Sequence, residues 1–207
     1  MTDEHVSAAR VERTTLGFTS TDGKTQVKGL MWQPSKPTPV RGVVQIVHGM
    51  TEYVGRYDDF ARFLAARGFA VCGHDHIGHG KSSPDASDRG HMPVAEGEDV
   101  LVGDVEALRA LAAARFPRTT PYFLFGHSMG SFVTRVYLTR HAAGLAGAVL
   151  CGTGNKALVV SKAGNLLARL IAKRSGERTV SPFLHSMADG AYSKAVENPR
   201  TANLLAE

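Results

Sequence analysis

The chain has 207 residues, of which 43% are hydrophobic and 21% charged, and it carries a formal net charge of +5. This length and composition indicate one globular domain with a small appendage and exclude a disordered or collagen-like chain. Residues 1–15 are polar and no apolar stretch approaches the length of a membrane span, so we expect a cytoplasmic protein without a signal peptide.

The positive charge is concentrated in the last third of the chain. Ten basic and four acidic residues follow Ser128, so this part carries +6. A basic region of this size fits either a solvated surface or a surface for anionic lipid or nucleic acid. No aromatic-interleaved basic stripe or nucleic-acid motif accompanies it. We therefore favour a solvated basic face and expect no nucleic-acid partner.

The residue pattern of the first third of the chain predicts three strands followed by a helix. Residues 11–18 and 25–32 flank a Thr-Asp-Gly-Lys turn signal and predict an antiparallel hairpin. Residues 42–47 form an apolar run that is typical of a strand buried on both faces. Residues 56–67 predict a helix that ends at a glycine, with Phe60, Phe63 and Leu64 on its apolar face.

Strands and helices then alternate. Strands are predicted at 69–74, 121–126 and 145–151, and helices at 98–114 and 129–141. Such alternation predicts an α/β fold with a mostly parallel sheet, to which the opening hairpin adds antiparallel strands. Cys72 and Cys151 lie inside apolar strand-like runs, so we expect both to be buried and reduced.

The alternation stops after residue 151. An amphipathic helix is predicted at 161–174, and residues 175–207 are polar and broken. We therefore divide the chain into a core, residues 1–151, and a lid segment, residues 152–207. The stripe formed by Leu166, Leu167, Leu170 and Ile171 fits either a packed lid face or a peripheral contact with a membrane. We favour the packed face.

One pentapeptide points to nucleophilic catalysis. Gly126-His127-Ser128-Met129-Gly130 lies between a predicted strand and a predicted helix. This context is that of the nucleophile elbow, where a sharp turn exposes a serine hydroxyl and the flanking glycines leave room for it. Ser128 is therefore the candidate nucleophile.

A second motif fits an oxyanion hole. His48-Gly49-Met50 ends the strand predicted at 42–47. The glycine lets the chain bend toward the serine, so the backbone amide of Met50 and that of Met129 can stabilise a tetrahedral oxyanion together. A simple strand-ending turn at His48-Gly49 is the alternative. We favour the oxyanion hole because the elbow follows in the required strand order.

These motifs together resemble the α/β-hydrolase superfamily, and within it the monoacylglycerol lipase and lysophospholipase-like group. The resemblance rests on HGMTEYVGRYDDFARFLAARGFAV, GHDHIGHGKSS and LFGHSMGS and covers residues 11–151 closely. It implies a serine hydrolase of carboxylic esters that needs no cofactor, with a monoacylglycerol or lysophospholipid as substrate. The same scaffold hosts peptidases and acyltransferases, which remain open as alternatives.

We expect the remaining polar motifs to have structural roles around the site. His74, Asp75, His76 and His79 resemble a metal cluster, but the family pattern implies a structural loop, so we expect no metal. Glu52 and Arg56 are expected to brace the oxyanion loop. We expect His127 to pack beside the elbow, and His91 to be exposed or to line the pocket.

The base and acid of a serine hydrolase are not apparent. Family members place an acid and then a histidine after the serine, each following a later strand. Only His141 and His185 follow Ser128, and Asp189 comes after His185, in the wrong order. We interpret the chain as truncated at its C-terminus, which leaves an inactive fragment or acyl-binding module as an alternative. His185 acting from the lid is the less favoured explanation. The sequence does not indicate an oligomeric state.

Overall fold

The computed structural model describes residues 11–35, 39–92, 96–154, 158–184 and 186. The chain divides into two compact units. The first comprises residues 1–90 and 97–153, and the second comprises residues 91–96 and 154–207. Each unit is described separately below.

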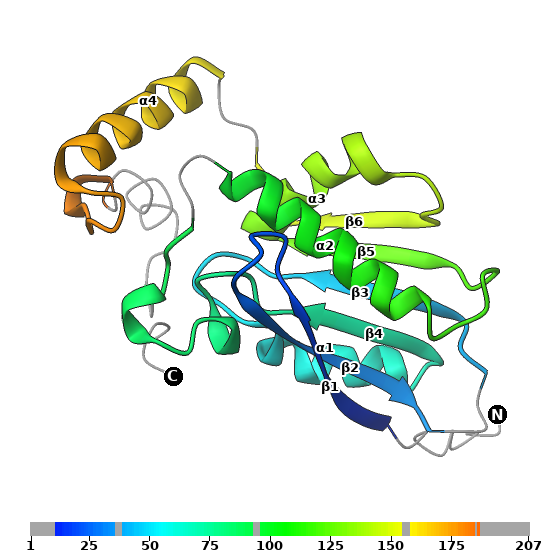
Figure 1. The fold of residues 1–207 in the computed structure, drawn as a ribbon. Coiled ribbons are helices and arrows are strands. Elements are labelled where there is room, and N and C mark those ends of the chain that lie inside the picture. The colour runs from blue at the N-terminus through cyan, green and yellow to red at the C-terminus, as the bar shows by residue number, and fades with distance from the viewer. Residues whose placement is uncertain (1–10, 36–38, 93–95, 155–157, 185, 187–207) are drawn as a thin grey trace, which may run out of the picture. The chain divides into compact units, whose positions relative to one another are not determined.

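The first unit is built on a six-stranded sheet with the order β1-β2-β4-β3-β5-β6 (Figure 1). β4, β3, β5 and β6 run parallel, and the β1–β2 hairpin joins them antiparallel through β2. The predicted α/β fold with an antiparallel hairpin is confirmed. The strands are β1 (Val11–Thr19), β2 (Gln26–Pro34), β3 (Gly42–Val47), β4 (Phe69–His74), β5 (Tyr122–His127) and β6 (Gly147–Cys151).

Helices cover both faces of this sheet. α1 (Asp58–Ala65) lies behind it in Figure 1, whereas α2 (Gly97–Ala113) crosses in front and packs against α3 (Met129–His141). Three short 3-10 turns, η1 (Val54–Tyr57), η2 (Gly80–Ser82) and η3 (Ala86–Asp88), complete the connections.

The helix predicted at 56–67 differs from the observed one in two respects. Its start is a 3-10 turn, because the carboxylate of Asp75 accepts the backbone N–H of Val54 at 2.7 Å and fixes the chain there. Phe63 was expected to be buried and is 50% exposed. Its ring lies under the guanidinium of Arg67 at 3.6 Å, so a cation–π contact takes the place of core packing.

The core between α1 and the sheet is continuous. Its fully enclosed members come from β2, β3, β4, η1 and α1, and are Trp32, Ile46, Val54, Ala61, Ala65 and Val71. Phe60 and Phe125 pack against this cluster with ring centroids 5.1 Å apart. Burial of this apolar face holds β3 and β5 in place, and the functional motifs follow the ends of these two strands.

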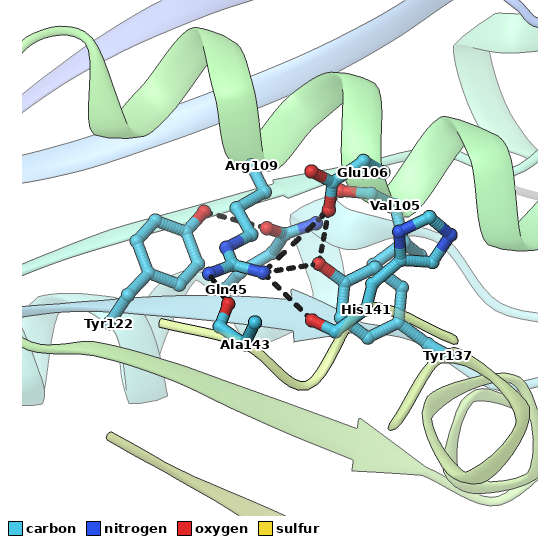
Figure 2. Close-up of polar contacts among 8 residues, drawn as sticks. All are labelled: Gln45, Val105, Glu106, Arg109, Tyr122, Tyr137, His141 and Ala143. Carbon is cyan, nitrogen blue, oxygen red and sulfur yellow. Dashed lines mark hydrogen bonds and ion pairs between the residues drawn. The ribbon is translucent and has the colours of Figure 1, made fainter. Parts of the chain in front are cut away.

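A second set of contacts joins α2, α3 and the sheet on the opposite face (Figure 2). The guanidinium of Arg109 donates to the Tyr137 hydroxyl at 2.8 Å, to the His141 carbonyl at 3.0 Å and to the Ala143 carbonyl at 2.7 Å. Tyr137 in turn donates to Glu106. We call these residues, with Gln45 and Tyr122 described next, the Arg109 network.

The same network reaches the middle of the sheet. The Tyr122 hydroxyl donates to Gln45 at 2.6 Å, and the Gln45 amide donates to the Val105 carbonyl of α2 at 2.9 Å (Figure 2). Burial of the phenol raises the pKa of Tyr122, which keeps its hydroxyl protonated as a donor. Polar side chains thus fix the helix pair on the sheet.

β6 is the exposed edge of the sheet. It pairs with β5 alone, and Val149 and Leu150 are 55% and 37% exposed. Cys151 is exposed as well, so the expectation that it is buried was wrong. Within the described residues no helix covers the outer part of this strand, and its apolar run is therefore open to solvent. Cys72, on a central strand, is buried as expected.

The described part of the second unit is mainly α4 (Leu158–Ser175), slightly longer than the helix predicted at 161–174. Leu166 and Leu170 are 61% and 56% exposed on it. None of the helices described in the structure combines the length and apolar character that a membrane crossing requires. The role of this unit as a lid stays a prediction.

Candidate active site

Ser128 lies at the sharp turn between β5 and α3, in a strained backbone conformation. Its φ of 50° and ψ of −119° belong to a region that residues other than glycine rarely adopt. The backbone N–H of Ser128 donates to the Cys151 carbonyl at 2.9 Å, and its carbonyl accepts from Ser131. These bonds hold the turn from both sides.

The two glycines of the pentapeptide are required by the packing around this turn. A Cβ atom at Gly130 would lie 1.9 Å from the Val47 carbonyl oxygen. A Cβ atom at Gly126 would lie 2.4 Å from the Thr134 hydroxyl. The start of α3 therefore touches the end of β3 directly, which brings the elbow beside the His48-Gly49 segment.

Gly49 is the point where the two motifs meet. A Cβ atom at Gly49 would lie 3.0 Å from the Cβ of Ser128 and 2.6 Å from Oε1 of Glu52. The structure thus brings together the candidate nucleophile and the candidate oxyanion loop, which are almost 80 residues apart in the sequence. Only glycine permits this approach.

The ring of His48 orients the peptide between Gly49 and Met50. Its Nε2 accepts the backbone N–H of His76 at 3.0 Å, so the proton resides on Nδ1, which donates to the Gly49 carbonyl at 2.7 Å. In a trans peptide the N–H of Met50 points opposite to that carbonyl, away from the buried ring.

Within the described residues, the backbone amides of Met50 and Met129 are available as donors. The N–H of Met50 has no acceptor within the described residues, and the Met50 side chain is 52% exposed. The N–H of Met129 belongs to the first residue of α3 and has no acceptor inside the helix. It also lies at the positive end of the helix dipole, where negative charge is stabilised.

Glu52 connects the loop to the elbow. Its Oε1 accepts the Gly49 N–H, the Tyr57 hydroxyl at 2.9 Å and Nδ1 of His127 at 3.0 Å. The Glu52 side chain is 11% exposed, and that of His127 is 40% exposed. Burial and the charge of Glu52 raise the pKa of Tyr57, so its hydroxyl remains a donor.

Four histidines pack together next to the candidate oxyanion loop: His48, His74, His76 and His79, here called the histidine cluster. The His48 and His76 rings have centroids 4.2 Å apart, and those of His74 and His76 are 5.0 Å apart. Burial lowers the pKa of His74 to about 3 and holds the pKa values of His48 and His76 well below their usual range. The three rings are therefore neutral near pH 7.

The loop after β4, which carries His76 and His79, is shaped by Asp75. Its carboxylate accepts the backbone N–H of Val54 and of Lys81, at 2.7 and 2.8 Å. Gly80, at φ 48°, could not carry a side chain there, since a Cβ atom would lie 2.3 Å from that carboxylate. Within the described ranges, no group of three or more histidine, cysteine or acidic side chains is placed to hold a metal ion.

The other sequence candidates fall in different places. His141, at the end of α3, stacks on Tyr137 with ring centroids 5.1 Å apart, far along the helix from Ser128. Arg56 is exposed. His91 is half-buried and belongs to the second unit. His185 and Asp189 lie outside the described residues. No side chain in the described part of the chain hydrogen-bonds the Ser128 hydroxyl.

His127 differs from its expected role in one respect. It was assigned to packing, but its ring makes a hydrogen bond to Glu52, 75 residues earlier in the chain. Nothing in the local pattern around His127 signals this partner, because the contact depends on how two loops meet. The acidic residue three positions after Gly49 was the available signal.

A family comparison covers most of the chain. The model described as "Serine aminopeptidase, S33" matches residues 38–202. The match includes the His48-Gly49 segment, the Asp75 loop and the elbow.

Sequence relatives carry lipase names. The chain is 34% identical over 148 residues to a protein of Mycolicibacterium smegmatis named monoacylglycerol lipase, covering 71% of this chain and 48% of the relative. It is 34% identical over 119 residues to the mouse monoglyceride lipase, covering 58% of this chain and 36% of the relative. The chain thus spans about half or less of the length of these two relatives.

A solved structure agrees with the fold. A thermostable carboxyl esterase from Bacillus coagulans, in complex with glycerol, superposes with a TM-score of 0.79 at 35% sequence identity. The superposition covers 91% of this chain and 59% of the esterase. Both the described sheet and its connections therefore have a close counterpart among ester hydrolases.

Proposed function

Since the chain belongs to the S33 serine aminopeptidase family of α/β-hydrolases, we propose that it carries the nucleophile of a carboxylic ester hydrolase. Ser128 would be the nucleophile, and the amides of Met50 and Met129 would stabilise the oxyanion. The observation that carries this proposal is the strained backbone of Ser128 in contact with Gly49. Beside it are the two backbone amides of Met50 and Met129, for which the described residues provide no acceptor.

The chemistry follows from these groups. The Ser128 oxygen attacks the ester carbonyl while its proton passes to a base, and the carbonyl oxygen becomes negative in the tetrahedral intermediate. Two preorganised N–H donors stabilise that charge, and each such donor contributes roughly 100-fold or more to the rate. The alcohol then leaves, and water hydrolyses the acyl-enzyme.

The base must come from outside the described residues. Ser128 has no histidine partner there, and His127, although adjacent, uses Nδ1 to bind Glu52. Without a base, the oxyanion hole alone sustains only a small residual rate above that in water. We therefore expect Ser128-dependent chemistry that is accelerated by a small diffusible base such as imidazole.

The proposed substrate is a monoacylglycerol or a lysophospholipid. Support comes from the relatives named monoacylglycerol and monoglyceride lipase and from the esterase solved with glycerol. The description of the family model favours one second candidate, a peptidase that removes N-terminal residues. The two differ in whether the enzyme prefers an acylglycerol or an aminoacyl anilide.

The test is covalent labelling of the purified chain with a fluorophosphonate, with the modified residue identified by mass spectrometry. We expect the adduct on Ser128, faster in the presence of imidazole, and none in Ser128→Ala. Ser161→Ala is the matched control, since Ser161 is an exposed serine of α4, in the second unit. Folded protein that stays unlabelled with imidazole present would exclude the proposed nucleophile. Monoacylglycerol and aminoacyl anilide turnover then separate the two candidates.

A further inference from the structure

We infer that Glu52 is a positioning residue that fixes the distance between the oxyanion loop and the nucleophile elbow, and that His127 is the elbow's attachment to it. A single carboxylate oxygen accepts hydrogen bonds from three segments. Gly49 belongs to the oxyanion loop, Tyr57 to η1 and His127 to the last position of β5. The inference rests on the proposed function for its kinetic consequences only.

The loop around Gly49 is held from both sides of its backbone. Glu52 accepts its N–H, and the His48 ring donates to its carbonyl at 2.7 Å. Thr51 adopts a φ of 60°, a conformation that residues other than glycine rarely take. This turn carries the Glu52 side chain back over Gly49. The Met50 amide between these anchors therefore has one orientation.

The elbow is attached to the same oxygen through the residue before Ser128. Nδ1 of His127 lies 3.0 Å from Oε1 of Glu52, and a Cβ atom at Gly49 would lie 3.3 Å from the His127 carbonyl oxygen. The Tyr57 ring lies edge-on to the His127 ring, with centroids 6.4 Å apart. The carboxylate sits between the two motifs and contacts both.

Such a link acts on the transition state and not on substrate binding. The two amides contact the carbonyl oxygen strongly only when it becomes negative, so a displacement of Met50 relative to Ser128 lowers the maximal rate. The concentration that gives half the maximal rate depends on how the enzyme binds the rest of the substrate or probe, so we expect it to change little. A merely structural role would instead lower the amount of folded protein without altering either constant.

Three variants separate the elements of the link. His127→Ala removes the elbow attachment, whereas His127→Asn places an amide N–H near the position of Nδ1 and can restore it. Glu52→Gln keeps the shape of the side chain but replaces its charged oxygen by a neutral one, which weakens the three hydrogen bonds that this oxygen accepts. Glu12→Gln is the control, because Glu12 is exposed on β1, away from the site.

The kinetic experiment measures phosphonylation of Ser128 at increasing fluorophosphonate concentration, with imidazole present. We expect Glu52→Gln and His127→Ala to lower the maximal rate by about tenfold or more, with half-saturation within about twofold of wild type. His127→Asn should recover most of the rate, and Glu12→Gln should match wild type. Folded variants with an unchanged maximal rate, or with the loss confined to half-saturation, would overturn the inference.

A second measurement does not depend on activity. Amide hydrogen exchange of Gly49, followed by NMR in the same folded chains, should be slow in wild type and faster in Glu52→Gln. His127→Ala should perturb the Gly49 and Met50 amide signals through the shared oxygen, whereas Glu12→Gln should not. If wild type shows no Ser128 labelling, the proposed function fails and this measurement alone decides the link. Unchanged Gly49 exchange in Glu52→Gln would refute it.

Discussion

The Arg109 network and the histidine cluster are both polar clusters of the first unit, yet they differ in how completely they are hydrogen-bonded. Arg109 makes three hydrogen bonds that join α2, α3 and the chain after α3 (Figure 2). In the histidine cluster, both ring nitrogens of His74 and Nδ1 of His76 are buried without a protein partner in the described structure. The first region satisfies its polar groups and the second does not.

The difference extends to the backbone. Two residues other than glycine have a positive φ in the described structure, Thr51 and Ser128. Thr51 lies in the loop that follows His48, and Ser128 packs against Gly49 of the same loop. Unsatisfied polar groups and strained conformations raise the free energy of the folded state and persist where surrounding structure compels them. We infer that the Arg109 network stabilises the fold. The region around Ser128 lowers the stability of the fold, and its strained backbone holds Ser128 close to Gly49.

The largest expected effect is a loss of stability at low pH, which arises from the histidine cluster. The pKa values of His48, His74 and His76 are lowered by burial, that of His74 to about 3 from an ordinary 6.5. The unfolded chain therefore binds more protons than the folded one below about pH 6.5, so stability falls as pH decreases. Each histidine contributes up to about 1.4 kcal/mol per pH unit, roughly 4 for the three together.

Urea unfolding at several pH values from about 7.5 down to about 4.5 measures this slope. From these histidines we expect no dependence above about pH 7.5, where both states are neutral. Replacing His74 by leucine should lower the slope by up to about 1.4 kcal/mol per pH unit. A slope that His74→Leu leaves unchanged would show that the acid sensitivity has another source.

The next largest effect is expected in the other region. Arg109→Met should lower the free energy of unfolding by about 3 kcal/mol, because it leaves two carbonyls and the Tyr137–Glu106 pair without their donor. Arg62→Met is the matched control. Arg62 pairs with Asp58 at a more exposed position, where we expect a loss below about 1 kcal/mol. Equal losses in urea unfolding would contradict the stabilising role assigned to Arg109.

An effect of opposite sign is expected at His74. His74→Leu removes two buried nitrogens that have no protein partner and keeps an apolar side chain of similar size. Because an unsatisfied buried polar group costs roughly 1–3 kcal/mol, the variant should be more stable by about 2 kcal/mol at neutral pH. His48→Leu is the comparison: His48 makes two hydrogen bonds, so its loss should destabilise. A destabilised His74→Leu would mean that ordered water satisfies the ring.

The two regions also differ in how well the sequence predicts them. β3 and β4 were predicted to the residue, because each is an apolar run bounded by glycine or a polar loop. The sharp turn at Ser128 was also predicted, because Gly126 and Gly130 are needed where the turn packs closely and such glycines are visible in the local sequence. The Glu52–His127 bond and the contacts of Arg109 were not predicted, since they join residues 75 and 28 or more positions apart. Cys151 is exposed because β6 lies at the edge of the sheet. The apolar pattern of a strand does not indicate whether it lies at the edge or in the centre.

The smallest predicted effect concerns Ser128 itself. At φ 50° and ψ −119°, a residue with a Cβ costs roughly 1–3 kcal/mol, whereas glycine adopts this conformation freely but loses roughly 0.5–1 kcal/mol in chain entropy. Ser128→Gly should therefore be more stable than wild type by about 1 kcal/mol, although it lacks the hydroxyl of the candidate nucleophile. Ser128→Ala keeps the Cβ and the strain, so it should stay within about 0.5 kcal/mol of wild type. The comparison of these two variants in urea separates relief of backbone strain from loss of the hydroxyl. If Ser128→Gly were less stable than Ser128→Ala, the elbow would not store the strain that its dihedral angles indicate.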